Sequence, residues 1–348
     1  MGKKNTKNRK SSDKHVSEPM HLGKTDKRRG KGLLGIAVGA RARFRYDNAC
    51  TVFVEFCKLN RHMEVALFVE RRRYLEPDQI RLLDKTLSSY FELAYESDPA
   101  DVSSESLRGV RIFAHHNCSE LLCGISDRFP ECAKALPRAN RSLVAWGREK
   151  QPNRAPPFPL AFVFALIGWA LSIGLGSFAL GIVCMFSGLL RPGEFFNLQV
   201  QDVVVGPTGV VLSLWDTKTT RLKAAAECAQ IKCPRFTQIV SALLPMLPGL
   251  IWTRSVADFR DTFNDACLAL GLVSFKFRLY SLRRGGATYL HEVIGMDRLL
   301  ERGRWQSTKT ARVYLDDARA HLATFKLTVQ AQAQHHRHLH FLAVRFGW

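Results

Sequence analysis

Residues 155–190 contain no charged side chain, and this stretch constrains the fold more than any other part of the sequence. An uncharged apolar run longer than about eighteen residues is typical of a membrane-spanning helix. Five glycines and three serines interrupt the run, however, and it ends directly at Arg191-Pro192-Gly193-Glu194. It is too long for one span and too short for two spans with a loop. A membrane anchor over residues 158–190 and a pair of buried core helices both fit this pattern.

Residues 45–146, before this stretch, show the pattern of amphipathic helices. Apolar residues recur at three- and four-residue steps, as on one buried helix face, at Tyr46, Ala49, Phe53, Phe56 and Cys57. Similar patterns predict three more helices, at residues 82–93, 107–125 and 133–146. A proline-containing segment at residues 151–157 breaks the pattern and predicts a linker. We therefore expect a helical domain over residues 42–150.

Strand signals follow the apolar stretch. Residues 203–205 and 210–215 flank a Gly-Pro-Thr-Gly turn and predict a β-hairpin. A third strand is expected at residues 224–232, after a polar turn at residues 216–221, and residues 236–322 have helical patterns again. The predicted fold class is mainly α with a small antiparallel β-sheet (α+β). A second domain is expected over residues 158–325, with a C-terminal tail at residues 326–348.

The chain is strongly basic, with a formal net charge of +20. Residues 1–31 contain eleven lysines and arginines against three acids, so +12 belongs to the rest of the chain. A basic excess spread over a folded body indicates a polyanionic partner, either nucleic acid or an anionic membrane surface. Residues 1–41 have almost nothing to bury, and we expect a disordered basic tail there. Its two basic clusters are typical of a nuclear address or a DNA-binding arm.

The nine cysteines are scattered, and an odd number without a secretory signal favours reduced thiols in an intracellular compartment. Two groups invite comparison with metal sites, but neither has paired C-x-x-C spacing: His115, His116, Cys118 and Cys123, and the pair Cys228 and Cys233. The histidine-rich run at residues 335–340 could also hold a metal, although a solvated tail is expected. We therefore expect no metal and no cofactor.

Several arginines and one tyrosine in the C-terminal half suit phosphodiester chemistry without a metal. Such chemistry needs an in-line nucleophile, fixed cations on the non-bridging oxygens, and an acid for the leaving oxygen. Arginine suits the clamp because its planar fork grips phosphate by two hydrogen bonds. Three segments supply these groups: Leu189-Leu190-Arg191-Pro192-Gly193-Glu194, Tyr280-Ser281-Leu282-Arg283-Arg284-Gly285-Gly286, and Gly303-Arg304-Trp305 with Thr310-Ala311-Arg312-Val313-Tyr314-Leu315.

These segments resemble the tyrosine recombinase (phage integrase) family, which includes Cre-like and Xer-like enzymes. The resemblance covers roughly residues 42–325 and is most specific between Arg283 and Tyr314. It implies a helical core-binding domain and an integrase-type catalytic domain that clamp duplex DNA, with self-association into a synaptic tetramer. It also implies DNA recombination or integration, as in mobile elements, through a covalent 3′-phosphotyrosine that needs no cofactor.

The resemblance assigns a role to individual positions of this chain. Arg191 and Arg283 match the two catalytic arginines, and Glu194 matches the acidic residue that usually follows the first. Trp305 stands where the family has His or Trp, and Tyr314, nine residues later, stands at the nucleophile position. Lys218 matches the hairpin lysine that acts as general acid, with Lys223 as an alternative.

One position departs from the family's pattern. The family usually has histidine three residues before the second arginine, and this chain has Tyr280 there. A phenol with a pKa near ~10 donates a hydrogen bond but is a poor base at neutral pH. Three hypotheses therefore stand: an active recombinase or integrase, a degenerate relative that binds DNA without cutting it, and a membrane-associated protein.

Overall fold

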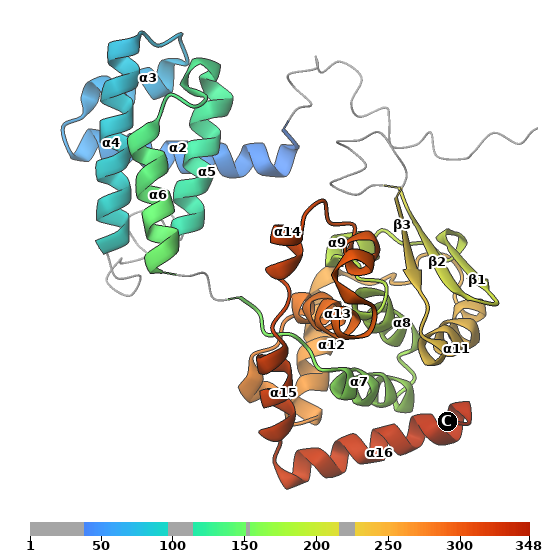
Figure 1. Cartoon of the computed structure of the whole chain (residues 1–348). Coiled ribbons are helices and arrows are strands. Elements are labelled where there is room, and N and C mark those ends of the chain that lie inside the picture. Colours follow the sequence, from blue (N-terminus) through green and yellow to red (C-terminus); the bar gives the residue numbers. More distant parts are fainter. Residues whose placement is uncertain (1–37, 97–113, 151–153, 216–226) are drawn as a thin grey trace, which may run out of the picture. The chain divides into compact units, whose positions relative to one another are not determined.

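The computed structural model describes residues 38–96, 114–150, 154–215 and 227–348. Two compact units make up the chain, Met1–Pro152 and Asn153–Trp348 (Figure 1). Each unit buries a hydrophobic core of its own. The nine cysteines are all free thiols.

The N-terminal unit is a helical bundle. Its described elements are α2 (Ala40–Leu59), α3 (Met63–Arg71), α4 (Pro77–Glu96), α5 (His115–Arg128), the 3₁₀ turn η3 (Pro130–Cys132) and α6 (Pro137–Glu149). α2 packs on α3 and α5, and α4 packs on α6. Phe53 and Tyr90 meet in the core at 5.4 Å between ring centroids. The buried Asp84 carboxylate of α4 accepts the backbone N–H groups of Arg138 and Ala139, and so caps the start of α6.

Two helices of this unit differ from the predicted ranges. The helix expected at residues 107–125 is α5, which runs on to Arg128, and residues 97–113 lie outside the described residues. The helix expected from residue 133 begins only at Pro137, because η3 and a short turn come first. Proline suits the first helical position, where its missing N–H would have had no helical partner.

The C-terminal unit is larger and contains the sheet. Its described elements are α7 (Leu160–Ser172), α8 (Gly176–Phe186), α9 (Pro192–Phe195), η4 (Val200–Asp202), β1 (Val203–Gly206), β2 (Gly209–Leu214), β3 (Glu227–Ile231), α11 (Pro234–Leu243), η5 (Leu244–Met246), α12 (Val256–Ala269), η6 (Val273–Phe275), α13 (Leu279–Gly303), α14 (Thr308–Arg312), α15 (Asp317–Phe325) and α16 (Val329–Phe346). The predicted fold class, mainly α with a small antiparallel sheet, is confirmed.

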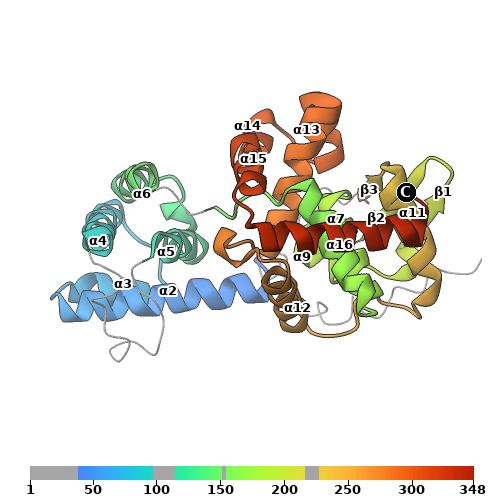
Figure 2. The same ribbon diagram turned by 90° about the horizontal axis from the view of Figure 1, so that it is seen from below.

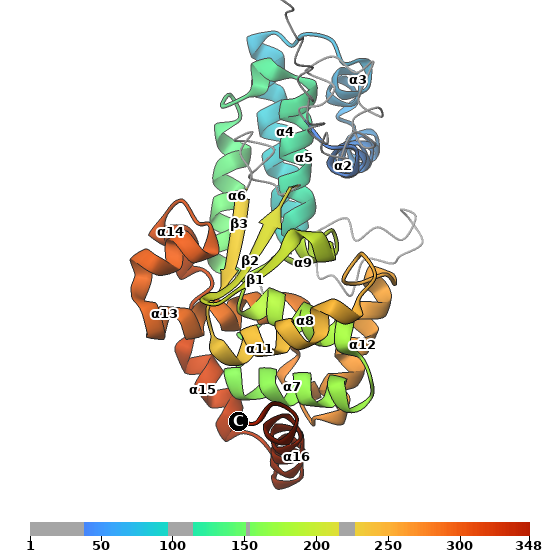
Figure 3. The same cartoon turned by 90° about the vertical axis from the view of Figure 1, so that its right-hand side faces the viewer.

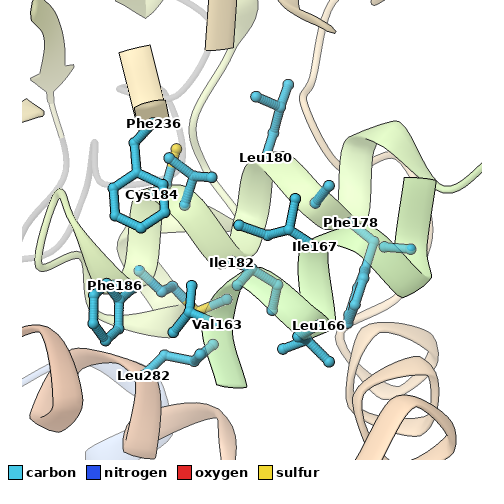
Figure 4. Close-up of a cluster of buried hydrophobic side chains, with 14 of the residues drawn as sticks. Val163, Leu166, Ile167, Phe178, Leu180, Ile182, Cys184, Phe186, Phe236 and Leu282 are labelled. Atoms are coloured by element: carbon cyan, nitrogen blue, oxygen red, sulfur yellow. The ribbon is translucent and has the colours of Figure 1, made fainter. Parts of the chain in front are cut away.

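The uncharged stretch forms two core helices, α7 of 13 residues and α8 of 11 residues. Their side chains interleave with one another, with Phe236 of α11 and with Leu282 of α13 (Figure 4). Among the described residues, no helix has both the length and the apolarity needed to cross a membrane. The absence of charge therefore reflects burial on all sides within a protein core.

The sheet has the order β1-β2-β3, and both pairs are antiparallel. The predicted hairpin turn joins β1 to β2, with Gly206 opposite Gly209. The third strand begins at Glu227, within the expected range. One face of the sheet packs on α11 (Figure 3), which buries Val210, Leu212 and Ile231.

Two glycines in the first turns of α13 allow its close approach to other chain segments. A Cβ at Gly285 would overlap the carbonyl oxygen of Phe158, and one at Gly286 would overlap that of Phe186. The Phe158 backbone N–H also donates to the Ser281 carbonyl oxygen at 3.0 Å. The first turns of α13 are therefore fixed against Phe158, before α7, and against the end of α8 at Phe186, five positions before Arg191.

The solvated tail expected at residues 326–348 is wrong. Residues 329–346 form α16, which lies across α7 (Figure 2). His335 is buried in this contact, with a ring nitrogen 3.1 Å from the Leu270 carbonyl oxygen and its ring edge-on to Phe162. Burial lowers the pKa of His335, so the ring is neutral at pH 7. The histidines dominate the sequence of this segment, but the helix also has an apolar face, with Leu339 and Leu342, that packs on the core.

Candidate active site

Arg191 lies where the chain leaves α8 and begins α9. It is the N-cap residue of α9, and its backbone N–H donates to Glu194 Oε2 at 2.8 Å. Its guanidinium also forms an ion pair with Glu194 Oε1. The Arg191 side chain keeps 30% of its surface exposed, while that of Glu194 keeps 4%. In the Arg-Pro-Gly-Glu segment, the buried Glu194 carboxylate therefore holds the Arg191 guanidinium in place while that guanidinium remains accessible to solvent.

The Glu194 carboxylate is the centre of a cluster of three arginines. Arg304 Nη2 lies 2.6 Å from Glu194 Oε2, and Arg283 Nη1 lies 3.7 Å from the same oxygen. With Arg191, the cluster contains three positive charges against one negative charge. A second carboxylate, that of Glu227 at the start of β3, lies 3.6 Å from Arg304 Nε.

Arg304 is a site residue that sequence reasoning missed. Arg304 follows Gly303, and its own backbone is left-handed, with φ of 58°. The Arg304 side chain is only 7% exposed. This backbone turn directs the guanidinium back toward Glu194, whereas a surface arginine would point outward. The only sequence signal is a further arginine between Gly303 and Trp305, and nothing in that pattern predicts the turn.

Arg283 lies on the first turns of α13 and is fully buried. Its Nη1 donates to the Leu189 carbonyl oxygen and its Nη2 to that of Gly303, the latter at 2.9 Å. Its Nε has no hydrogen-bond partner among the described residues. Burial and the nearby guanidinium groups of Arg304 and Arg191 lower the pKa of Arg283 to about 10. It therefore remains charged at neutral pH.

Two aromatic rings cover the Arg283 guanidinium. Its Cζ lies 5.1 Å from the ring centroid of Trp305 and 5.6 Å from that of Tyr314, and the two rings are 4.6 Å apart. The Trp305 Nε1–H is buried and makes no hydrogen bond of ordinary geometry within the described part of the chain, but it lies near enough to the Tyr314 hydroxyl to help lower the pKa of that group. An indole N–H can only donate, so this group is available to an acceptor oxygen of a ligand.

The helical pattern over residues 236–322 predicts a helix at Tyr314, but the structure has no helix at that position. α14 ends at Arg312, and α15 begins at Asp317, so Tyr314 stands in the turn between them. The Asp316 side chain starts the second helix by accepting the Arg319 backbone N–H. Thr288 of α13 holds the turn, because its Oγ1 accepts the Asp316 N–H at 3.3 Å. This tertiary contact and the new N-cap interrupt the helix that the apolar pattern predicted.

The Tyr314 hydroxyl meets that of Tyr280, with 2.6 Å between the two oxygens. Burial and this hydrogen bond raise the pKa of Tyr280 to about 12. Burial also acts to raise the pKa of Tyr314, but the hydrogen bond with Tyr280, the charge of Arg283, the Trp305 indole N–H and the charge of Arg191 outweigh it and lower that pKa. These directions make Tyr314 the phenol that ionises first, and Tyr280 can then donate to the phenolate.

The structure brings together five of the six residues predicted from the sequence: Arg191, Tyr280, Arg283, Trp305 and Tyr314. Lys218 and its alternative Lys223 lie outside the described residues. β3, which begins at Glu227, is attached to the site through Arg304 and through Arg302, whose Nη2 donates to the Gln230 carbonyl oxygen at 2.7 Å.

The arrangement is suited to binding an anion and holding a phenolate. An excess of guanidinium charge combines with buried N–H donors on Arg283 and Arg304 that lack hydrogen-bond partners among the described residues. Buried donors are normally satisfied, and preorganised donors of this kind stabilise oxyanions. Among the described residues, no group of three or more His, Cys, Asp or Glu side chains is placed to hold a metal ion.

No protein-family model and no curated protein matches the chain. Solved structures similar to it include XerH site-specific recombinase bound to difH substrate in a pre-cleavage complex, at 12% identity, covering 81% of this chain and 96% of that one, with a TM-score of 0.41. A lambda integrase dimer bound to a COC′ core site is 14% identical, covers 75% of this chain and 71% of that one, and has a TM-score of 0.43. XerA recombinase is 12% identical, covers 83% and 97%, and has a TM-score of 0.38.

Proposed function

We propose that this chain binds duplex DNA and cleaves and rejoins one strand through a covalent 3′-phosphotyrosine at Tyr314. The observation that supports this most is the Tyr314 hydroxyl, which lies in a basic site with a lowered pKa and a donor, Tyr280, at 2.6 Å. A core phenol far from any substrate would have no need of two guanidinium groups, those of Arg283 and Arg191, acting on it.

The proposed step exchanges one phosphoester for another. The Tyr314 oxygen attacks the scissile phosphorus, a P–O bond to tyrosine forms, and the bond from phosphorus to the 5′ oxygen breaks. The phenol proton leaves to solvent, and the 5′ oxygen takes a proton from a general acid, for which Lys218 is the candidate. Because one phosphoester replaces another, rejoining by the reverse step needs no other energy source.

Arg191, Arg283 and Trp305 are proposed to hold the non-bridging oxygens while charge builds on them. Arg191 is the accessible guanidinium, since Arg283 lies beneath the rings of Trp305 and Tyr314. A phosphate can reach Arg283 only if the Tyr314 ring moves aside. DNA binding and the placement of the nucleophile are therefore coupled in this proposal.

The proposal extends to the assembly that the family resemblance implies, a tetramer of this chain on two duplexes that recombines or integrates DNA. The helical N-terminal unit would contact DNA phosphates from its basic side chains. Such contacts give affinity that depends on salt and little reading of sequence.

A trapping experiment tests the nucleophile. The full chain is incubated with a pool of nicked duplexes whose flanking sequences are randomised, so that the short released strand diffuses away and the adduct accumulates. Adducts that survive denaturation are digested with trypsin, and the modified peptide is identified by mass spectrometry. We expect the DNA on the peptide of residues 313–319, which contains Tyr314, and not on that of residues 279–283, which contains Tyr280.

Two variants provide the controls. Tyr314→Phe should lose the adduct and keep DNA binding, because the arginines remain. Tyr289→Phe removes a hydroxyl from another partly buried tyrosine of the same unit and should form the adduct at the parent level. An adduct that persists in Tyr314→Phe would contradict the proposal.

A second candidate function is DNA binding without cleavage. It is favoured by Tyr280 at the usual histidine position and by Arg283, whose two terminal nitrogens already donate to backbone carbonyl oxygens. In the same experiment this candidate predicts retention of the duplex pool with no covalent adduct from any sequence.

A further inference from the structure

The C-terminal unit contains a basic pocket of about 320 Å³. Four cationic side chains line it, from the segment before α7, the turn before α13 and α15: Arg154, Lys276, Arg278 and Arg319. Phe275 forms part of its apolar wall. Arg278 is also the N-cap residue of α13, so the positive end of that helix dipole lies at the pocket.

The positive charge of this pocket is poorly compensated. None of the ion pairs between described residues involves Arg154, Lys276 or Arg278. Arg319 is paired with Asp316, with 3.5 Å between Nε and Oδ2, and remains 60% exposed. Four like charges around one concavity repel each other, and an anion in the pocket would relieve that repulsion.

Arg284 connects this pocket with the candidate active site. It follows Arg283 on α13, is 5% exposed, and its Nε has no hydrogen-bond partner among the described residues. It lies within electrostatic range of the Asp316 carboxylate, of Arg154 and Arg319 of the pocket, and of Tyr280 of the candidate active site. A buried guanidinium with a free donor between two basic sites indicates that both serve one polyanion.

We propose that this pocket is a second phosphate-binding subsite, for a DNA backbone phosphate that flanks the one held at Tyr314. The inference rests on the proposed function, since it takes DNA as the ligand of the first site. The subsite would fix which DNA phosphate lies opposite Tyr314. Its expected contribution to DNA binding is one phosphate contact.

The test compares two charge-matched double variants of the full chain. Arg154→Gln with Lys276→Gln removes two exposed charges from the pocket, and neither residue has a role in the candidate active site. Arg260→Gln with Arg337→Gln removes two exposed charges from α12 and α16. Binding of a fluorescent duplex of arbitrary sequence is measured by anisotropy as a function of salt, and thermal melting confirms that both variants fold.

The pocket variant should reduce the slope of log K against log salt by about 0.9 for each DNA phosphate that the pocket no longer binds, while the control pair leaves it unchanged. Equal slopes for the parent and the pocket variant would overturn the subsite. If Arg191→Ala still weakened binding in that case, the proposed function would survive. If the parent chain bound no duplex at all, both proposals would fall.

A free phosphate ion is the other source of the same chemistry. Thermal melting with inorganic phosphate distinguishes the two: if phosphate raised the melting temperature of the parent but not of the pocket variant, while the duplex slope stayed equal in both, the pocket would be a site for free anions. That result would also overturn the DNA subsite.

Discussion

The phenols of Tyr280 and Tyr314 share one short hydrogen bond. Their surroundings shift the pKa values of the two phenols in opposite directions. The pKa of Tyr280 is raised to about 12, so it stays protonated while Tyr314, whose pKa is lowered, ionises. Tyr280 cannot accept the proton of the proposed nucleophile, Tyr314, at neutral pH, but it can stabilise the resulting phenolate. A tyrosine at the usual histidine position is therefore compatible with a nucleophile that loses its proton to solvent.

Tyr280→Phe tests this role of the phenol pair. Without the donor, the pKa of Tyr314 should rise, and the midpoint of adduct formation against pH should move upward. Below the midpoint the rate falls with the phenolate fraction, about tenfold for each pH unit by which the midpoint rises. Tyr280→His retains a ring donor and should keep the lower midpoint. A Phe variant with the parent pH profile would show that Tyr280 does not act on the nucleophile.

Glu194→Gln tests whether the carboxylate holds the arginine cluster together. The substitution preserves the shape but leaves Arg191, Arg283 and Arg304 without their shared counterion. Removing one partner of a buried ion pair costs about 3–5 kcal/mol, which should appear in denaturant unfolding of the C-terminal unit. Glu301→Gln, an exposed carboxylate on α13, should unfold like the parent. Equal stability of the two variants would contradict the assignment of Glu194 as the anchor.

At the scale of elements, the site depends on the close packing of α13 against the end of α8. Arg283 and Tyr280 come from α13 and Arg191 from the segment after α8, so their separation is set by this contact. Gly286 permits it, because any side chain there would meet the Phe186 carbonyl oxygen, which is backbone and cannot rotate away.

Gly286→Ala should therefore destabilise the C-terminal unit. Ordinary overpacking costs about 1–3 kcal/mol, and a backbone obstacle should place this variant at or above the upper end of that range. Gly249→Ala, where a Cβ meets nothing within 4 Å, is the matched control. Both are measured by guanidinium unfolding. A Gly286→Ala variant as stable as the control would show that α13 can shift at no cost.

Local sequence patterns correctly predicted those helices and strands whose ends are set by nearby residues. The Gly-Pro-Thr-Gly turn at residues 206–209 specified the hairpin, and the glycines at 174 and 176 divide the uncharged stretch into α7 and α8. The predictions failed where a contact with residues far away in the sequence determines the local structure. Thr288 holds the Tyr314 turn open, and the contact with Leu270 and Phe162 brings His335 into the core.

The candidate site shows the same division. The order and spacing of Arg191, Arg283, Trp305 and Tyr314 identified residues that the fold brings together, although they span more than a hundred positions of the sequence. Arg304 could not be found this way, because its burial depends on a left-handed backbone and a carboxylate far away in the chain. The short Tyr280–Tyr314 contact depends on the relative placement of α13 and the turn after α14.

For the whole molecule, the common feature of the different parts of the chain is an excess of positive charge. The C-terminal unit alone contains two sites with excess positive charge, the arginine cluster at Glu194 and the pocket beside α13. A further +8 of the total of +20 belongs to residues 1–31, which lie outside the described residues. If DNA is the common ligand, each of these regions adds phosphate contacts independently of base sequence.

Deletion of residues 1–31 measures the share of the tail in DNA binding. The slope of log K against log salt should flatten by about 0.9 for each phosphate contact that the tail makes, and affinity at low salt should fall with it. Replacing the eleven lysines and arginines of this segment with glutamine in the full-length chain is the control for length, and it should reproduce the effect of the deletion. Formation of the proposed Tyr314 adduct at saturating DNA should survive in both, because the proposed catalytic groups lie in the other unit. An unchanged slope after deletion would show that the tail stays off the DNA and that the remaining +12 accounts for binding.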